Sequence, residues 1–202
     1  MGREKLPLMW FLLERIMINR TDKLVFLIGL SIFTIGQFWI YQFGSTTKEL
    51  SSVDVSHWIM LIGVVLYLPF IMRLPRHGVG VITSILMTIG VVCMIGMCII
   101  DLVFWGIADD GLRTAVANEL INTPMVWQPF MLWGNEEVLM TGFMLACSLY
   151  IKQSKVGPLL VVFGSILAIA GASWFNFIAY ILISIGFLVC FNFFRRDNQQ
   201  ES

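Results

Sequence analysis

The residues best suited to chemistry in this chain are acids and one histidine that stand at the ends of long apolar runs. Carboxylates and an imidazole can hold a divalent cation, act as an acid–base pair, or bind a ligand through charge and hydrogen bonds. An ionisable group within an apolar run is a functional-site hypothesis by default, since burying it in hydrocarbon costs about 3 kcal/mol. The predicted ligand-binding set contains Asp101, His57, Glu136, Glu137, Asp109 and Asp110.

Asp101 is the most unusual member of this set, because the apolar stretch "LVFWGIA" follows it. A membrane span that starts near Val79 crosses the hydrocarbon in about 20 residues. We therefore expect Asp101 close to the membrane boundary, where it needs either a protein partner or water. Both readings stay open: the base of a ligand site, or a solvated interface residue.

The same side of the protein is expected to be rich in tryptophan. An aromatic belt predicts Trp at both membrane interfaces, but only Trp10 of the seven falls on the other side. A pocket with Trp105 and Trp133 among its aromatic walls would account for the bias, as would simple anchoring of a long loop. The residues on that side are Trp39, Trp58, Trp105, Trp127, Trp133 and Trp174.

The pattern gives little support to a known enzyme class. The sequence has neither an HExxH nor a CxxC motif, and its four cysteines lie inside apolar runs, where packing explains them. His57 and His77, the two histidines, are predicted on opposite sides of the membrane, which argues against ligation of haem by the pair. We expect neither haem nor a nucleotide; a divalent cation is the one cofactor that the acids and His57 suit.

The elements that must position these residues are membrane helices. The chain has 202 residues, of which 58% are hydrophobic and 13% charged, against about 25% charged in a soluble domain. Hydropathy predicts an all-α integral membrane protein with a six-helix bundle. Pro69 should kink the second span, and Asn176 should cap the sixth at "GASWFNF". The spans are expected near 24–43, 57–72, 79–105 and 138–151, with two more inside 157–194.

The basic residues set the expected orientation. With the N-terminus inside, eleven of the thirteen lie in cytoplasmic segments, and Lys48 and Arg113 are the exceptions. We therefore predict a multi-pass protein of a cell membrane, most readily the bacterial inner membrane, with both termini cytoplasmic. Residues 1–23 form an amphipathic interfacial segment, 24–194 the membrane domain and 195–202 a cytoplasmic tail.

The outer loop, 107–136, is too long to be structureless. Asp109 or Asp110 can cap a helix in its first half, and Pro124 should end that helix. The second half, "MVWQPFMLWG", suits the interface or a return toward the bundle, and Asn135 should cap the fourth span. The apolar face of the loop helix comprises Leu112, Ala115, Val116 and Leu120.

Three functions follow from these observations. The leading hypothesis is a non-enzymatic membrane protein that binds a cation, a small amphiphile or a partner protein at its acidic, Trp-rich outer surface. The second is a membrane-embedded hydrolase or transferase that uses the carboxylates and His57, with or without a metal. The third is a transporter active as an oligomer, packed through a row of small residues at Gly164, Ala168 and Ala172. Besides the lipid bilayer, a protein partner or a second copy is expected; no basic patch suits nucleic acid.

Overall fold

The structure is a computed structural model that describes residues 18–43, 50–132, 137–171 and 173–192. Within these ranges every regular element is a helix and no strand occurs. Three helices are long and apolar enough to cross a membrane, namely Arg20–Gln42, Val55–Met72 and Val79–Trp105. Shorter apolar helices are Glu137–Ser148, Val156–Ala170 and Phe175–Phe191. This set of helices is consistent with the predicted class, a helical membrane protein.

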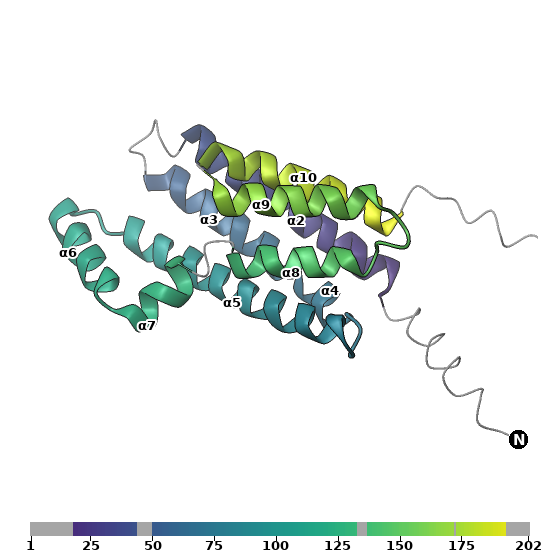
Figure 1. Cartoon of the computed structure of the whole chain (residues 1–202). Coiled ribbons are helices and arrows are strands. Elements are labelled where there is room, and N and C mark those ends of the chain that lie inside the picture. The colour runs from purple at the N-terminus through teal and green to yellow at the C-terminus, as the bar shows by residue number, and fades with distance from the viewer. Residues whose placement is uncertain (1–17, 44–49, 133–136, 172, 193–202) are drawn as a thin grey trace, which may run out of the picture.

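The long helices pack as a closed ring. α2 lies against α3, α3 against α5, and contacts then continue through α8, α9 and α10 back to α2. Figure 1 shows these helices running lengthwise beside one another, with α6 and α7 extending from one end. The ring helices are α2 (Arg20–Phe43), α3 (Leu50–Val65), α5 (Val79–Trp105), α8 (Glu137–Ser148), α9 (Val156–Ala170) and α10 (Ser173–Phe191).

Two kinds of shorter element complete the described chain. α4 (Leu68–Met72) follows α3 after a turn of two residues and contacts α2 and α5. The segment between α5 and α8 contains α6 (Asp110–Ile121), α7 (Pro124–Trp127) and a π-helical turn, η1 (Gln128–Leu132). We call residues 110–132 the arm. The arm follows the end of α5. α3 begins at the same end of the ring, so the arm and the start of α3 lie at that end together (Figure 1).

The second span, for which a kink at Pro69 was predicted, is interrupted just before this proline. α3 ends at Val65, and α4 begins at Leu68 with Pro69 in its first turn. Proline has no N–H to donate and its ring clashes with the preceding turn, so a helix cannot run through it undisturbed.

The cap predicted for the sixth span is wrong. α10 begins at Ser173, so Asn176 lies inside its first turn instead of preceding it. α9 ends at Gly171, which has an extended backbone conformation, so the connection to α10 is shorter than predicted. A Cβ atom at Gly171 would lie 2.9 Å from Oδ1 of Asn176. The asparagine side chain thus lies against the end of α9.

Aromatic rings fill the centre of the ring of helices. Phe26 of α2 is fully buried, and its ring centroid lies 4.5 Å from that of Phe70 and 5.0 Å from that of Phe187. Tyr67 and Phe143 also pack on it, at 5.2 and 5.9 Å. These rings come from segments far apart in the chain, so the core joins one side of the ring of helices to the other.

Paired glycines allow the closest helix approaches. A Cβ on Gly29 of α2 would come within 2.7 Å of the carbonyl oxygen of Gly63 in α3. Gly157 of α9 meets Gly186 of α10 in the same way, with 2.8 Å between such a Cβ and the carbonyl oxygen. Small residues at these crossings let backbones touch, which is how membrane helices gain packing energy without a hydrophobic driving force.

The row predicted for oligomer contacts is engaged within the chain. Gly164 is buried, and a Cβ there would lie 2.8 Å from the carbonyl oxygen of Ala179 in α10. Ala168 is 5% exposed, and Ala172 lies outside the described residues. A second copy could reach Gly164 only after α10 had moved, so this row offers no free surface at that position.

Candidate functional site

Asp101 finds a protein partner in His57. Nε2 of His57 in α3 lies 3.1 Å from Oδ2 of Asp101 in the last turns of α5. The side chains are 6% and 23% exposed, respectively. α3 and α5 are neighbours that run in opposite directions, so the beginning of one and the end of the other meet at the same level. Of the predicted set, the structure brings these two residues together.

This pair ties two helices together and orients the imidazole. A hydrogen bond between a ring nitrogen and a carboxylate fixes both the ring plane and the proton position, as in catalytic triads. A metal centre needs more ligands: among the described residues no three His, Cys, Asp or Glu side chains converge. The geometry therefore provides a polar link between α3 and α5 and an imidazole oriented by a carboxylate, which is one part of an acid–base device.

One turn beyond Asp101, Trp105 attaches the arm to the ring. The guanidinium carbon of Arg113 lies 5.3 Å from the Trp105 ring centroid, a cation–π distance. Nη2 and Nε of Arg113 both donate to the carbonyl oxygen of Ile107, at 2.8 and 3.1 Å. Although it is charged, the Arg113 side chain is only 16% exposed. Its three contacts fix the start of α6 relative to the end of α5.

The two neighbouring aspartates have local roles at the start of α6. Asp109 is its N-cap, accepting a 2.7 Å hydrogen bond from the Leu112 backbone N–H. The cap predicted from sequence is thereby confirmed for Asp109. Asp110 Oδ1 lies 3.1 Å from Nη2 of Arg113, and its side chain is 91% exposed. Neither carboxylate points to a shared centre with Asp101.

Removing the cap should loosen α6 without disturbing the ring of helices. We expect Asp109→Ala to destabilise α6 by about 1 kcal/mol, since an orphan N–H of the first turn loses its acceptor. Hydrogen exchange should then quicken in residues 110–121 alone. Asp110→Ala is the matched control and should have the smaller effect, because an exposed ion pair contributes little. Equal protection in wild type and Asp109→Ala would contradict the assignment.

The far end of the arm returns to the ring of helices. η1 contacts α5, and a Cβ atom on Gly96 of α5 would collide with the ring of Phe130. The aromatic ring therefore lies on the groove that this glycine leaves open. Of the two alternatives predicted for the second half of the loop, the return toward the bundle is confirmed.

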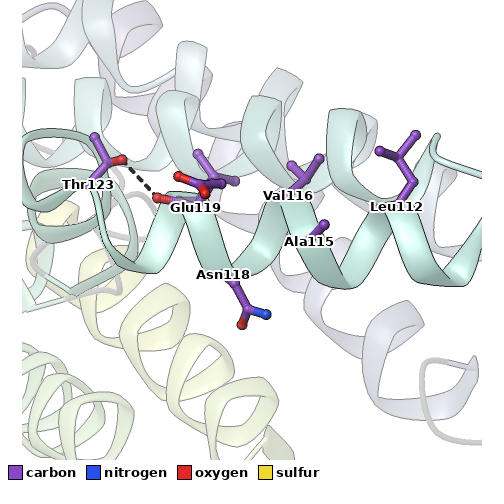
Figure 2. A pocket seen from close by; sticks show the side chains of 7 residues that line it. Leu112, Ala115, Val116, Asn118, Glu119 and Thr123 are labelled. Atoms are coloured by element: carbon purple, nitrogen blue, oxygen red, sulfur yellow. Dashed lines mark hydrogen bonds between the residues drawn. The ribbon is translucent and has the colours of Figure 1, made fainter.

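Between these two attachments, α6 is uncovered. It has no buried residue, and Leu112 is 56% exposed. Figure 2 shows Leu112, Val116 and Glu119 on one side of the helix and Asn118 on the other. An open concavity of about 630 Å³ lies along it, and every lining residue belongs to the arm itself. Ile121 and Met125 extend the exposed apolar surface, at 50% and 89%.

The other predicted site residues do not join the pair. Glu137 is exposed in the first turn of α8, while Glu136, Trp133 and the proposed cap Asn135 lie outside the described residues, as do 1–17 of the amphipathic segment and the tail. Arg113 and Phe130 were missed by sequence reasoning. For Arg113 a signal existed: it is one of two basic residues on the side where the charge rule expects few.

Comparisons with known protein families, with curated proteins and with solved structures gave no match. The site is therefore interpreted from its own contacts.

Proposed function

We propose that the chain is a six-span membrane protein of a cell membrane, with both termini cytoplasmic, that binds a partner protein on the outer side through its arm. Three candidate spans and three shorter apolar helices in one closed ring support the six spans. The basic residues of the connections opposite the arm, among them Arg73, Arg76, Lys152 and Lys155, support the orientation. The helices of the ring lie in the bilayer, and the arm projects from the ring on the outer side.

The exposed face of α6 carries the proposal. A helix of twelve residues is marginal by itself and gains its stability from burying an apolar face. α6 buries none, yet contacts at Trp105 and at Gly96 hold the arm on which it lies. A fixed helix with an uncovered apolar face is typical of recognition by a helix face.

A protein suits this face better than the bilayer surface does. Helices that lie in the membrane interface carry many Lys and Arg on their polar side. α6 has one basic residue, Arg113, which is already engaged by Trp105 and Ile107. Its apolar side also includes Glu119 (Figure 2), whose charge would be costly against lipid. At a protein interface such a carboxylate can lie in the polar rim around an apolar centre.

The other two predicted ligand classes gain less support. A small amphiphile needs walls that bury most of its surface, and the concavity at α6 is lined by the arm alone. A cation needs converging oxygen ligands, but Asp109 caps the helix and Asp110 faces Arg113. Asp110, Glu119 and Glu137 are exposed acids at this end. We therefore expect the partner to present an apolar groove bordered by basic side chains.

An enzyme remains the second candidate because of one observation, the 3.1 Å contact between His57 and Asp101. A carboxylate that orients an imidazole is the arrangement which general-base catalysis uses. The imidazole is 6% exposed, so a substrate would have to reach it from within the ring of helices. A loss of an enzymatic activity with His57→Gln, at unchanged folding, would favour this candidate over partner binding.

Photo-crosslinking in cells tests the partner. A photoreactive phenylalanine analogue at Leu112 should give one discrete adduct of higher mass, whose second component is identified by mass spectrometry. Charge reversal by Glu119→Lys should weaken this adduct, because like charges would then face each other. The matched control is the same analogue at Leu159, an apolar position that is 69% exposed near the start of α9, at the end of the ring opposite the arm.

The outcome separates the alternatives. An adduct of twice the mass of the chain would replace the proposed partner by a second copy. Adducts with lipid alone at Leu112 would place α6 in the interface and contradict the proposal. An equal adduct at Leu159 would show that the crosslinking reaction is unspecific and would remove the support for the proposal.

A further inference from the structure

A second surface, at the end of the ring opposite the arm, has features of a ligand site. A groove of about 320 Å³ lies between α4 and the start of α5. Its walls are mainly apolar, with Met72, Val81 and Ile85 exposed at 74%, 37% and 55%. Arg76 is also part of the lining. The groove thus combines an apolar trough with one cation.

The position of the groove relative to the candidate spans indicates which part of the membrane surrounds it. One candidate membrane span ends at Met72, and the next begins at Val79. The groove bridges these two ends. With the spans placed in the bilayer as proposed above, its apolar part on α5 lies in the hydrocarbon, while Arg76 lies in the connection between the spans. A site at this level meets both acyl chains and headgroups.

The charges at the groove favour an anion. Arg76 is exposed and has neither an ion pair nor a hydrogen bond among the described residues. Arg73 lies four positions before His77 and is 64% exposed. Its Nε lies 3.9 Å from Oδ2 of Asp22, which is a long distance for an ion pair. Basic pockets between membrane helices are typical binding places of anionic lipid headgroups.

The backbone adds to this preference. Gly78 adopts a φ of +51°, which lets the chain turn tightly from Arg76 into α5. α5 begins there without a side-chain cap, and the positive end of a 27-residue helix borders the groove through Val81. The guanidinium group and the helix start therefore favour negative charge at the same mouth.

We propose that this groove binds one anionic phospholipid of the adjoining leaflet. The phosphate is held by Arg76 at the mouth, and an acyl chain lies along Met72, Val81 and Ile85. Apolar walls at the depth of the hydrocarbon select a lipid over a free phosphate ion. The proposal is independent of the partner at the arm and would stand if that partner were absent.

Lipid titration of the full-length protein in nonionic detergent tests the site. Native mass spectrometry would count bound phosphatidylglycerol and phosphatidylcholine with identical acyl chains. Phosphatidylglycerol should bind more tightly, and Arg76→Gln should lower its affinity by about fivefold, the effect of one basic residue near a charged headgroup. Lys152→Gln, an exposed basic residue in the connection between α8 and α9, is the matched control and should leave the affinity unchanged.

A second variant tests the apolar half of the site. Val81→Trp fills the trough but keeps Arg76, so it should reduce lipid binding while circular dichroism shows an intact helical fold. Equal affinity for the two lipids, or an equal loss with Lys152→Gln, would overturn the proposal. So would full competition by millimolar inorganic phosphate, which would indicate an anion site without a lipid chain. A dimer that excludes lipid would assign the groove to a second copy.

Discussion

Phe26→Ala is expected to lower the free energy of unfolding by about 3–5 kcal/mol, the range found for phenylalanine truncation in a packed core. Phe26 is 0% exposed, and the rings of Tyr67, Phe70, Phe143 and Phe187 pack around it. In a membrane protein the loss is mainly one of packing, because lipid chains are as apolar as the core. The truncation removes contacts to three segments at once, namely α4 with its N-cap Tyr67, α8 and α10.

Unfolding in mixed detergent micelles, titrated with sodium dodecyl sulfate, would measure this loss. Phe163→Ala is the matched control: Phe163 is 61% exposed on α9 and packs little within the chain. A small effect at Phe163 and a large one at Phe26 would agree with the closed ring of helices. Equal effects at the two positions would contradict it, since then Phe26 would not lie at its centre.

Much of the fold could be predicted because the bilayer imposes a simple rule on the sequence. Apolar runs of sufficient length become helices, since no other open structure satisfies the backbone in hydrocarbon. The break at Pro69 and the cap at Asp109 follow from local chemistry within one turn, and both were predicted. Asn176 was misassigned because α9 ends at Gly171 and α10 already begins at Ser173, so the connection between them is shorter than the sequence suggested.

The neighbours of each helix could not be predicted in this way. Apolar helices have similar surfaces, and close approach depends on which small residues meet. Gly164 was correctly seen as a contact position, but the sequence does not state that α10 of the same chain occupies it. The closure of the ring between α10 and α2 had no local signal at all.

For the candidate site too, the positions of single residues could be predicted from the sequence, but the contacts between them could not. His57 and Asp101 were both expected near the outer boundary, because each stands at the end of an apolar run. Their contact depends on α3 and α5 being neighbours, which is a property of the ring of helices. Arg113 was missed as a structural residue because its partners, Trp105 and the Ile107 carbonyl, are brought together by a turn. Whether any of these residues binds a ligand stays a prediction.

Asp101→Leu is expected to destabilise the protein by about 1.5–3 kcal/mol, the contribution of a hydrogen bond to a charged group. The loss arises because His57, 6% exposed, is left without the carboxylate 3.1 Å away. Asp101→Asn is the conservative control: it keeps a carbonyl acceptor and should lose only part of this energy. The same detergent titration measures both variants.

A double-mutant cycle gives this prediction its decisive test. If His57 and Asp101 stabilise the ring of helices through their mutual contact, the effects of His57→Leu and Asp101→Leu should not add. Replacing both members by apolar groups removes the imidazole together with its carboxylate, so the double variant should be no less stable than Asp101→Leu alone. Additive losses would show that the two side chains act separately.

Stabilisation of the wild type by a divalent cation, abolished by Asp101→Asn, would instead show by mass action that a cation binds at Asp101. That outcome would make a cation the leading candidate among the ligands. A shared metal would explain why the carboxylate of Asp101 lies beside the imidazole of His57, which a partner protein at the arm does not explain.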